Sequence, residues 1–273
     1  MKYLNIGCGY HYINSEEWVN LDFSKTGEVV IASNLLSGIP FGDNYFDLVY
    51  HSHVLEHFSK DDGIKLIQEC YRVLKPGGII RIAIPNVESI VREYISIIDK
   101  LSKDIDNQIL QENYEWIMLE MYDQTVRNKV GGKMAEFLNR PILKDENFIY
   151  KRIGSPAVKA RIDIKQKEEF PRVKGRWTLK KIIFRIKNKI KLMILGLDNM
   201  KYVTIGKFRL GGEIHQWMYD RISLTILLKN TNFTSIEEKD GFNSYIKNWA
   251  DYELDGKDGK LRKADSFFIE GIK

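Results

Sequence analysis

Short apolar runs alternate with turn-forming or helical stretches over the first hundred residues, and this alternation constrains the fold more than any other feature. Residues 2–7 (KYLNIG) end in glycine, and further strand candidates follow at 19–22 (VNLD), 29–33 (VVIAS) and 46–52 (FDLVYHS). Apolar strands joined through helical stretches favour a parallel sheet that is covered on both faces. We therefore expect an α/β fold with a doubly wound, mostly parallel sheet.

An amphipathic helix is predicted at residues 61–78, where apolar side chains recur at helical spacing. Asp61 or Asp62 can cap its start, and Pro76-Gly77-Gly78 is expected to end it. A strand at 78–86 and a helix at 88–101 follow.

The same pattern returns at the end of the chain. A helix with a turn is expected at 219–233, and strands are expected at 233–240 and 265–273, which brings the sheet to seven strands. Between these parts, helical periodicity continues through 113–140. The chain thus divides into a first half of the core (1–95), a mostly helical insertion before the last helix (96–212) and the C-terminal part of the core (213–273).

The net charge of +5 is concentrated in one segment of the insertion. Residues 151–191 contain fifteen Lys and Arg against three Asp and Glu, so the remainder of the chain carries a formal charge of −7. Within this segment, residues 178–196 can form a basic amphipathic helix. Such a helix can lie on an anionic membrane surface or pack its apolar side on the core, and both interpretations stay open. Nucleic acid is not expected as a partner, because no RNA-binding signature accompanies the charge.

Other sequence features favour a cytoplasmic protein. Cys8 and Cys70 lie far apart in unlike contexts, which argues against a disulfide framework. We find no signal-peptide pattern at the start and no uncharged apolar run of membrane-spanning length. Peripheral contact with the inner face of a membrane through 178–196 remains an expectation, and the oligomeric state is left open.

A glycine-containing turn after the first strand is the first feature that suggests chemistry. Gly7 and Gly9 let the backbone turn sharply and approach a ligand closely. Asp22 ends the next strand, where a carboxylate can accept hydrogen bonds from both hydroxyls of a ribose. A dinucleotide-binding enzyme would show a third glycine and a longer helix between these two features.

Five motifs in order resemble the class I S-adenosylmethionine (SAM)-dependent methyltransferases, in particular the small-molecule group and relatives thought to act in polysaccharide biosynthesis. The motifs are LNIGCG, VNLD, LLSGIPFGDNYFDLVYHSHVLEH, IQECYRVLKPGG and IRIAIPN. The resemblance covers residues 1–95 well and 213–273 loosely. It implies an enzyme of the EC 2.1.1 type with a Rossmann-like core, SAM as cofactor and S-adenosylhomocysteine (SAH) as product.

The resemblance also implies which residues bind the cofactor. The glycine loop would contact the methionine part of SAM, Asp22 the ribose and Phe23 the adenine. Asn5 stands where the family usually has an acidic residue, and His11 where it usually has a third glycine. The full set expected at the cofactor is Asn5, Gly7, Cys8, Gly9, Asp22, Phe23, Asn34, Leu35, His51 and Ser52.

Methyl transfer to an alcohol needs a group that takes the hydroxyl proton, and histidine suits this role near neutral pH. His53 directly follows the fourth strand, and His215 lies where the chain re-enters the core, so these two are the expected catalytic residues. His11, His57 and Trp217 are expected to contact the substrate.

Residues 53–57 also match the H-x-x-E-H pattern of a zinc-peptidase family. That site requires its histidines on a helix of a peptidase fold, whereas these residues follow a sheet strand. We therefore expect no metal.

The sequence thus predicts O-methylation of a sugar hydroxyl, or of a phosphate-type oxygen, on a nucleotide- or lipid-linked saccharide or capsule-glycan precursor. A methyltransferase of a quinone or another small metabolite is one alternative. A SAM- or SAH-binding module without turnover is the other.

Overall fold

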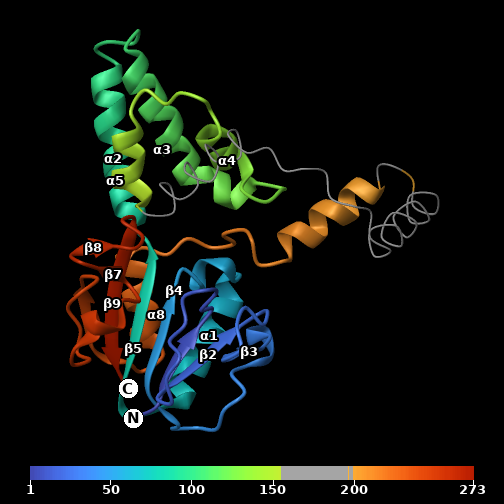
Figure 1. The fold of residues 1–273 in the computed structure, drawn as a ribbon, viewed down its shortest axis with the longest axis vertical. Coiled ribbons are helices and arrows are strands. Elements are labelled where there is room, and N and C mark those ends of the chain that lie inside the picture. The colour runs from blue at the N-terminus through green and yellow to red at the C-terminus, as the bar shows by residue number, and fades with distance from the viewer. Residues whose placement is uncertain (155–195, 197–198) are drawn as a thin grey trace.

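The structure is a computed structural model that describes residues 1–154, 196 and 199–273. Nearly all of the basic segment 151–191 and of the helix expected at 178–196 therefore lies outside the described residues. Figure 1 shows two parts: a sheet with its covering elements, and a group of helices beyond one end of the strands.

Seven strands form the main sheet, as the sequence predicts. Their order is β3-β2-β1-β4-β5-β9-β6, in which β9 runs antiparallel to both of its neighbours and all other pairs are parallel. The strands span Tyr3–Ile6 (β1), Trp18–Asp22 (β2), Val30–Ala32 (β3), Phe46–Ser52 (β4), Leu74–Pro85 (β5), Thr234–Lys239 (β6) and Ser266–Ile272 (β9).

One face of the sheet packs against two helices, α1 (Lys60–Val73) and α8 (Arg221–Asn230). Leu66 and Ile67 of α1 share a buried apolar cluster with Leu224 of α8 and with strand residues such as Val49. Burial of these side chains is the main force that holds the helices on the sheet. The cap of α1 is Ser59, whose hydroxyl accepts a hydrogen bond from the Asp62 backbone at 3.2 Å, so neither aspartate caps the helix.

The prediction that Pro76-Gly77-Gly78 ends this helix is also wrong. The helix ends at Val73, and the three residues lie inside the long strand β5. The register against β4 shifts there, from Phe46 opposite Leu74 to Leu48 opposite Ile79. The Pro-Gly-Gly stretch is thus accommodated as a bulge, where a residue such as Gly77 can adopt a positive φ of 78°.

The opposite face of the sheet is covered by the irregular segment 240–262. It contains the short helix η3 (Trp249–Tyr252) and the hairpin β7–β8 (Gly256–Lys257 and Lys260–Leu261). Trp249 and Leu254 pack there against Tyr3, Leu48 and other residues of the sheet. Between the first four strands the chain forms only turns and the short helix η1 (Leu35–Ser37), which follows β3, and so no longer helix is available for this face.

A buried arginine fastens this segment to the sheet. Arg81 of β5 is fully buried and pairs with Asp255 at 2.8 Å and with Glu270 at 2.7 Å. Its guanidinium also donates to the carbonyl oxygens of Asp240 and Asn243. Nearly all of its hydrogen-bonding capacity is met, as a buried charge requires.

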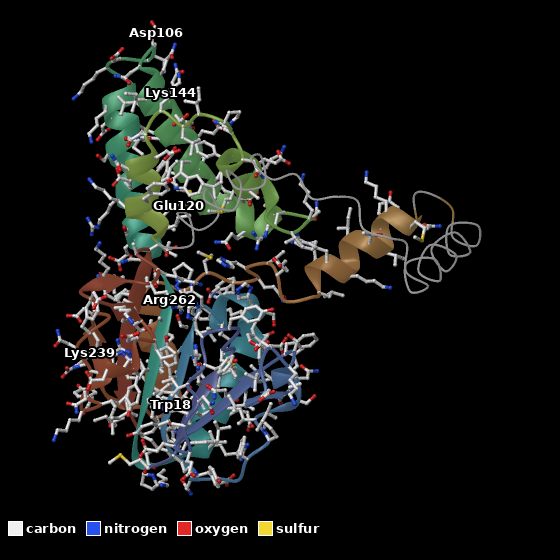
Figure 2. All side chains as sticks on the ribbon, in the orientation of Figure 1. Trp18, Asp106, Glu120, Lys144, Lys239 and Arg262 are labelled. Carbon is white, nitrogen blue, oxygen red and sulfur yellow. The ribbon has the colours of Figure 1, made fainter. Side chains whose placement is uncertain are left out.

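The helices α2 (Val87–Leu101), α3 (Gln108–Val126), α4 (Gly132–Leu138) and α5 (Glu146–Ile153) gather beyond the carboxyl ends of the parallel strands (Figure 1). Glu120 of α3 lies among these helices in Figure 2, and Trp18 lies in the sheet below them. The helical pattern expected over 113–140 is interrupted between α3 and α4. Asp123 accepts hydrogen bonds from the Lys133 and Met134 backbones there and so begins the second helix.

Residues 199–209 are helical and extend away from the rest of the molecule in Figure 1. Within the described ranges, we find no helix with the length and apolar character needed to cross a bilayer.

Candidate active site

The turn after β1 has the geometry expected of a ligand-binding loop. Gly7 and Gly9 adopt positive φ angles of 63° and 54°, a region that glycine enters at little cost. A Cβ on Gly7 would lie 2.3 Å from Cγ2 of Val54, whereas a Cβ on Gly9 would meet no atom within 4 Å. Gly7 is thus required by close packing against the turn after β4, and Gly9 by its backbone conformation.

Asp22, at the end of β2, joins this loop. Its carboxylate accepts a hydrogen bond from the Gly9 backbone at 2.9 Å and another from the Ser24 backbone at 3.1 Å. The glycine loop and the acidic residue that the sequence places thirteen positions apart therefore meet at the same edge of the sheet.

A cavity of 380 Å³ opens beside them. It is bordered by Gly7, Asp22, Phe23, Asn34 and Leu35, five of the residues expected at the cofactor. Phe23 is 75% exposed, so an aromatic face is available there for a planar group. Asn34 caps the short helix η1 through its side chain, which fixes the position of Leu35.

The other five residues expected at the cofactor do not border this cavity. Asn5 is buried, and its amide donates to the backbone of His11 and to Asn20, which holds the loop in shape. Cys8 and Gly9 complete the turn behind Gly7. Ser52 accepts a hydrogen bond from Arg262, and His51 is completely buried in β4.

A second cavity of 300 Å³ lies between the carboxyl ends of the strands and the helices α2–α5. His53 and His57 border both cavities, so the two spaces meet at the turn that follows β4. The second cavity also contains charged side chains of both signs and apolar groups, among them Glu56, Arg127, Lys263, Asp265, Ile90 and Met218.

The turn after β4 holds His53 in an uncommon backbone conformation. Its φ is 56°, a value that few residues other than glycine adopt and that tends to mark functional sites. Nδ1 of His53 lies 3.4 Å from Glu56, and Nε2 lies 2.8 Å from the Ser266 hydroxyl. A carboxylate can only accept, so the pair with Glu56 favours the tautomer with the proton on Nδ1.

The segment after the insertion is fastened to this same turn. The backbone amides of Gln216 and Trp217 donate to the Glu56 carbonyl at 2.7 and 3.2 Å, and the Gln216 side chain donates to the His57 carbonyl. His215 is thereby brought against His57, with ring centroids 4.9 Å apart at 84°. The two expected catalytic residues, His53 and His215, therefore border one cavity.

Burial dominates the electrostatics of this cluster. It lowers the pKa of His215 to about 3 and the pKa of His53 in the same direction, because a charged imidazole loses its hydration. Burial also lowers the pKa of Lys263 to about 8. Burial alone would raise the pKa of Glu56, but the neighbouring His53, His215 and His57 hold it below its usual range.

Two residues expected at the substrate lie elsewhere. His11 is exposed and borders neither of these cavities. Trp217 is 39% exposed and borders a third cavity together with Thr125 and Arg209, with the Lys60 ammonium 5.0 Å from its ring centre. Their contact with a substrate stays a prediction.

Several residues of the second cavity were not predicted from the sequence. Lys263 and Asp265 precede the antiparallel strand β9, whose first residues lie at the same edge as the last residues of the parallel strands. Because an antiparallel strand begins at the edge where its parallel neighbour ends, the position of Lys263 and Asp265 could have been predicted. Glu120 lies in α3 and Arg127 directly follows this helix, whose placement no local pattern reveals.

The order of the sheet, with one antiparallel strand between β5 and β6, defines the Rossmann-like methyltransferase fold. Residues 13–82 match the family model described as a methyltransferase domain. An uncharacterised protein of Methanocaldococcus jannaschii is 34% identical over 103 residues, which are 34% of this chain and 44% of that protein. Phosphoethanolamine N-methyltransferase of Plasmodium falciparum is 21% identical over 143 residues, half of each chain.

A solved SAM-dependent methyltransferase of Archaeoglobus fulgidus is 14% identical, with a TM-score of 0.40 over the whole of this chain and 86% of that one. The chain spans about half the length of the curated relatives it matches. Residues 13–82 thus match a methyltransferase domain, and the order of the sheet is that of the Rossmann-like methyltransferase fold, which implies SAM as the cofactor.

The residues of the first cavity fit this cofactor. Gly7, whose close packing on Val54 excludes a side chain, borders the cavity with its backbone. Asp22 offers carboxylate oxygens suited to ribose hydroxyls, and Phe23 with Leu35 offers apolar surface suited to an adenine.

Proposed function

We propose that the protein is an enzyme that transfers a methyl group from SAM to an oxygen of a saccharide. The acceptor is a sugar hydroxyl or a phosphate-type oxygen of a nucleotide- or lipid-linked glycan precursor. The observation that carries the proposal is the meeting of the two cavities at His53 and His57. A methyl donor beside Gly7 and an acceptor under the helices would approach each other at this turn.

When bound, SAM supplies a methyl group on a positively charged sulfur. With SAM held beside Gly7 and Asp22, this methyl group would be transferred to the acceptor oxygen, with the carbon–sulfur bond broken and SAH as the product. The hydroxyl proton passes to Nε2 of His53, the only one of the two expected catalytic histidines that borders both cavities. Glu56 orients the ring from the other nitrogen, and the Ser266 hydroxyl can rotate away from Nε2.

The helices contribute by closing the acceptor cavity. Ile90 of α2, Leu138 of α4 and Ile153 of α5 border it together with residues at the strand ends. Exclusion of water and alignment of the reacting atoms supply much of the rate of an in-line displacement.

The lining of the acceptor cavity supports a saccharide. Glu56, Glu120 and Asp265 can accept hydrogen bonds from sugar hydroxyls, and Ile90 and Met218 can pack against the C–H faces of a sugar ring. Arg127 and Lys263 could pair with a phosphate. The +12 charge of residues 151–191 is a further reason to expect an anionic acceptor.

The experiment is a transfer assay with methyl-labelled SAM, combined with calorimetric titration of SAM and SAH. The acceptors are nucleotide-linked sugars, lipid-linked saccharides, a quinone and phosphoethanolamine. We expect label in the saccharides and none without acceptor. Transfer to the quinone or to the amine alone would replace the proposed acceptor. Tight binding of both cofactors without transfer to any acceptor would identify a non-catalytic binding module.

A further inference from the structure

Three potential metal ligands converge in the acceptor cavity, although no metal is expected from the sequence. Glu56 and His57 come from the turn after β4, and His215 comes from the far side of the insertion. One ligand atom of each lies within 4.8 Å of the others. Nε2 of His215 is 3.9 Å from Oε1 of Glu56, close to the separation of about 3.4 Å between neighbouring ligands of a tetrahedral ion.

The Glu56 carboxylate lacks hydrogen-bond donors among the described residues, and this favours a cation as its partner. The residue is 1% exposed, and both carboxylate oxygens are buried without a hydrogen-bond donor among the described residues. A carboxylate buried without such donors is costly unless another partner, such as a cation, compensates it. The nearest ring nitrogen, Nδ1 of His53, remains 3.4 Å away.

The hydrogen bond that His57 makes is the one that histidine metal ligands usually make. Its Nδ1 lies 3.0 Å from the carbonyl oxygen of Ile214, which can only accept a hydrogen bond. The proton therefore sits on Nδ1, and Nε2 keeps its lone pair. Histidine ligands of metals typically donate their second nitrogen to a backbone carbonyl or a carboxylate in this manner.

The backbone around these groups is also held in place. The Gln216 amide binds the Glu56 carbonyl, and the His215 amide binds the Gln124 carbonyl at 3.0 Å. The segment that supplies His215 is thus anchored both to the turn after β4 and to α3.

We propose that Glu56, His57 and His215 bind one divalent first-row transition-metal ion, whose open positions take two neighbouring oxygens of the acceptor. Two imidazoles and one carboxylate suit such ions, whereas Mg²⁺ prefers oxygen ligands alone. The set differs from the zinc-peptidase pattern, because His215 replaces His53. This leaves His53 beside the ion to take the proton.

The metal ion would specify which acceptors the proposed enzyme prefers. Its role in catalysis rests on the proposed function. A divalent ion lowers the pKa of a bound hydroxyl and fixes its position. An acceptor with two adjacent oxygens, such as a vicinal diol or a hydroxyl beside a phosphate, would therefore be preferred over one with a single hydroxyl.

The first test measures binding without turnover. Full-length protein without a histidine tag is stripped with EDTA, dialysed and titrated with Co²⁺, Zn²⁺ and Mg²⁺. Binding is followed by calorimetry and, for Co²⁺, by visible absorption. We expect one site for Co²⁺ and Zn²⁺ and none of comparable affinity for Mg²⁺. In the E56Q and H215A variants the affinity should fall by more than about 100-fold, beyond the 10–100-fold typical of losing an outer-shell partner.

Control measurements separate misfolding from loss of the site. E253Q changes an exposed glutamate that borders neither cavity and should bind Co²⁺ as the unchanged protein does. SAH titration of every variant reports whether the fold and the cofactor site are intact. Unchanged Co²⁺ affinity in E56Q and H215A, with SAH binding retained, would overturn the proposed site.

The second test separates the metal site from the proposed function. Transfer to a saccharide that persists undiminished after EDTA treatment would overturn the role of the ion and leave the methyltransferase proposal standing. Stoichiometric Co²⁺ binding that E56Q abolishes, without transfer to any saccharide, would support the site and contradict the saccharide acceptor.

Discussion

Nδ1 of His57 lies 3.0 Å from the carbonyl oxygen of Ile214, so the turn after β4 is joined directly to the segment that follows the insertion. This contact, together with the bond from Gln216 to Glu56, brings His215 into the cavity that His53 and His57 border. The candidate site therefore combines two parts of the chain that are remote in sequence.

Replacement of Asp22 by Asn should weaken SAM and SAH binding by about 10- to 100-fold, because a hydrogen bond to a charged group contributes about 1.5–3 kcal/mol. The substitution also removes the charge of the carboxylate that accepts a hydrogen bond from the Gly9 backbone amide. Calorimetric titration measures the effect. Asp106→Asn, at the exposed tip of the helices in Figure 2, is the control and should bind as the unchanged protein does.

Gly7→Ala should destabilise the protein more than Gly9→Ala. Both substitutions place a Cβ at positive φ, which costs about 1–2 kcal/mol, but only the first also meets Val54 at 2.3 Å. Urea unfolding measures the difference. A Val54→Ala change combined with Gly7→Ala should recover part of the loss, and no recovery would show that contact with Val54 is not the cause.

His53→Ala should lower kcat by about 10²- to 10⁴-fold, the usual contribution of a general base, and leave the Kd of SAH nearly unchanged. Higher pH should recover part of the activity, because hydroxide can then accept the proton. Near-normal kcat with the true acceptor in both His53→Ala and His215→Ala would exclude the two histidines as the base.

His51 should make the fold sensitive to acid. Burial lowers its pKa from 6.5 to about 4, so the unfolded chain binds a proton between these values that the folded chain does not. Stability due to this group is complete above pH 6.5 and falls as the pH drops towards 4, by up to about 3 kcal/mol. In His51→Leu, urea unfolding between pH 7 and pH 4.5 should show a smaller loss; an equal loss would contradict the prediction.

Arg81→Met should cost about 3–5 kcal/mol of unfolding free energy, because it leaves Asp255 and Glu270 buried without their partner. Arg140→Met removes an exposed pair with Glu115 and should cost less than about 1 kcal/mol. Denaturant titrations compare the two. Similar small losses in both variants would show that Arg81 does not hold the segment 240–262 on the sheet.

The strands and the cofactor loop could be predicted from the sequence because their signals are local. Apolar runs predict all seven strands, and the spacing of Gly7 and Asp22 predicts the cofactor edge. The end of α1 could not be predicted in this way. Pro76-Gly77-Gly78 usually ends a helix, but pairing with β4 draws the residues from Leu74 onward into a strand.

The sequence by itself thus determined the class of fold, the glycine loop after β1 and the position of the turn that carries His53. Only the tertiary structure decided that Glu56, His57 and His215 share a cavity and that Asn5 and His51 do not border the cavity beside Gly7. The reason is physical. Strand and turn formation depends on neighbouring residues, whereas the approach of His215 depends on hydrogen bonds between segments that the whole insertion separates.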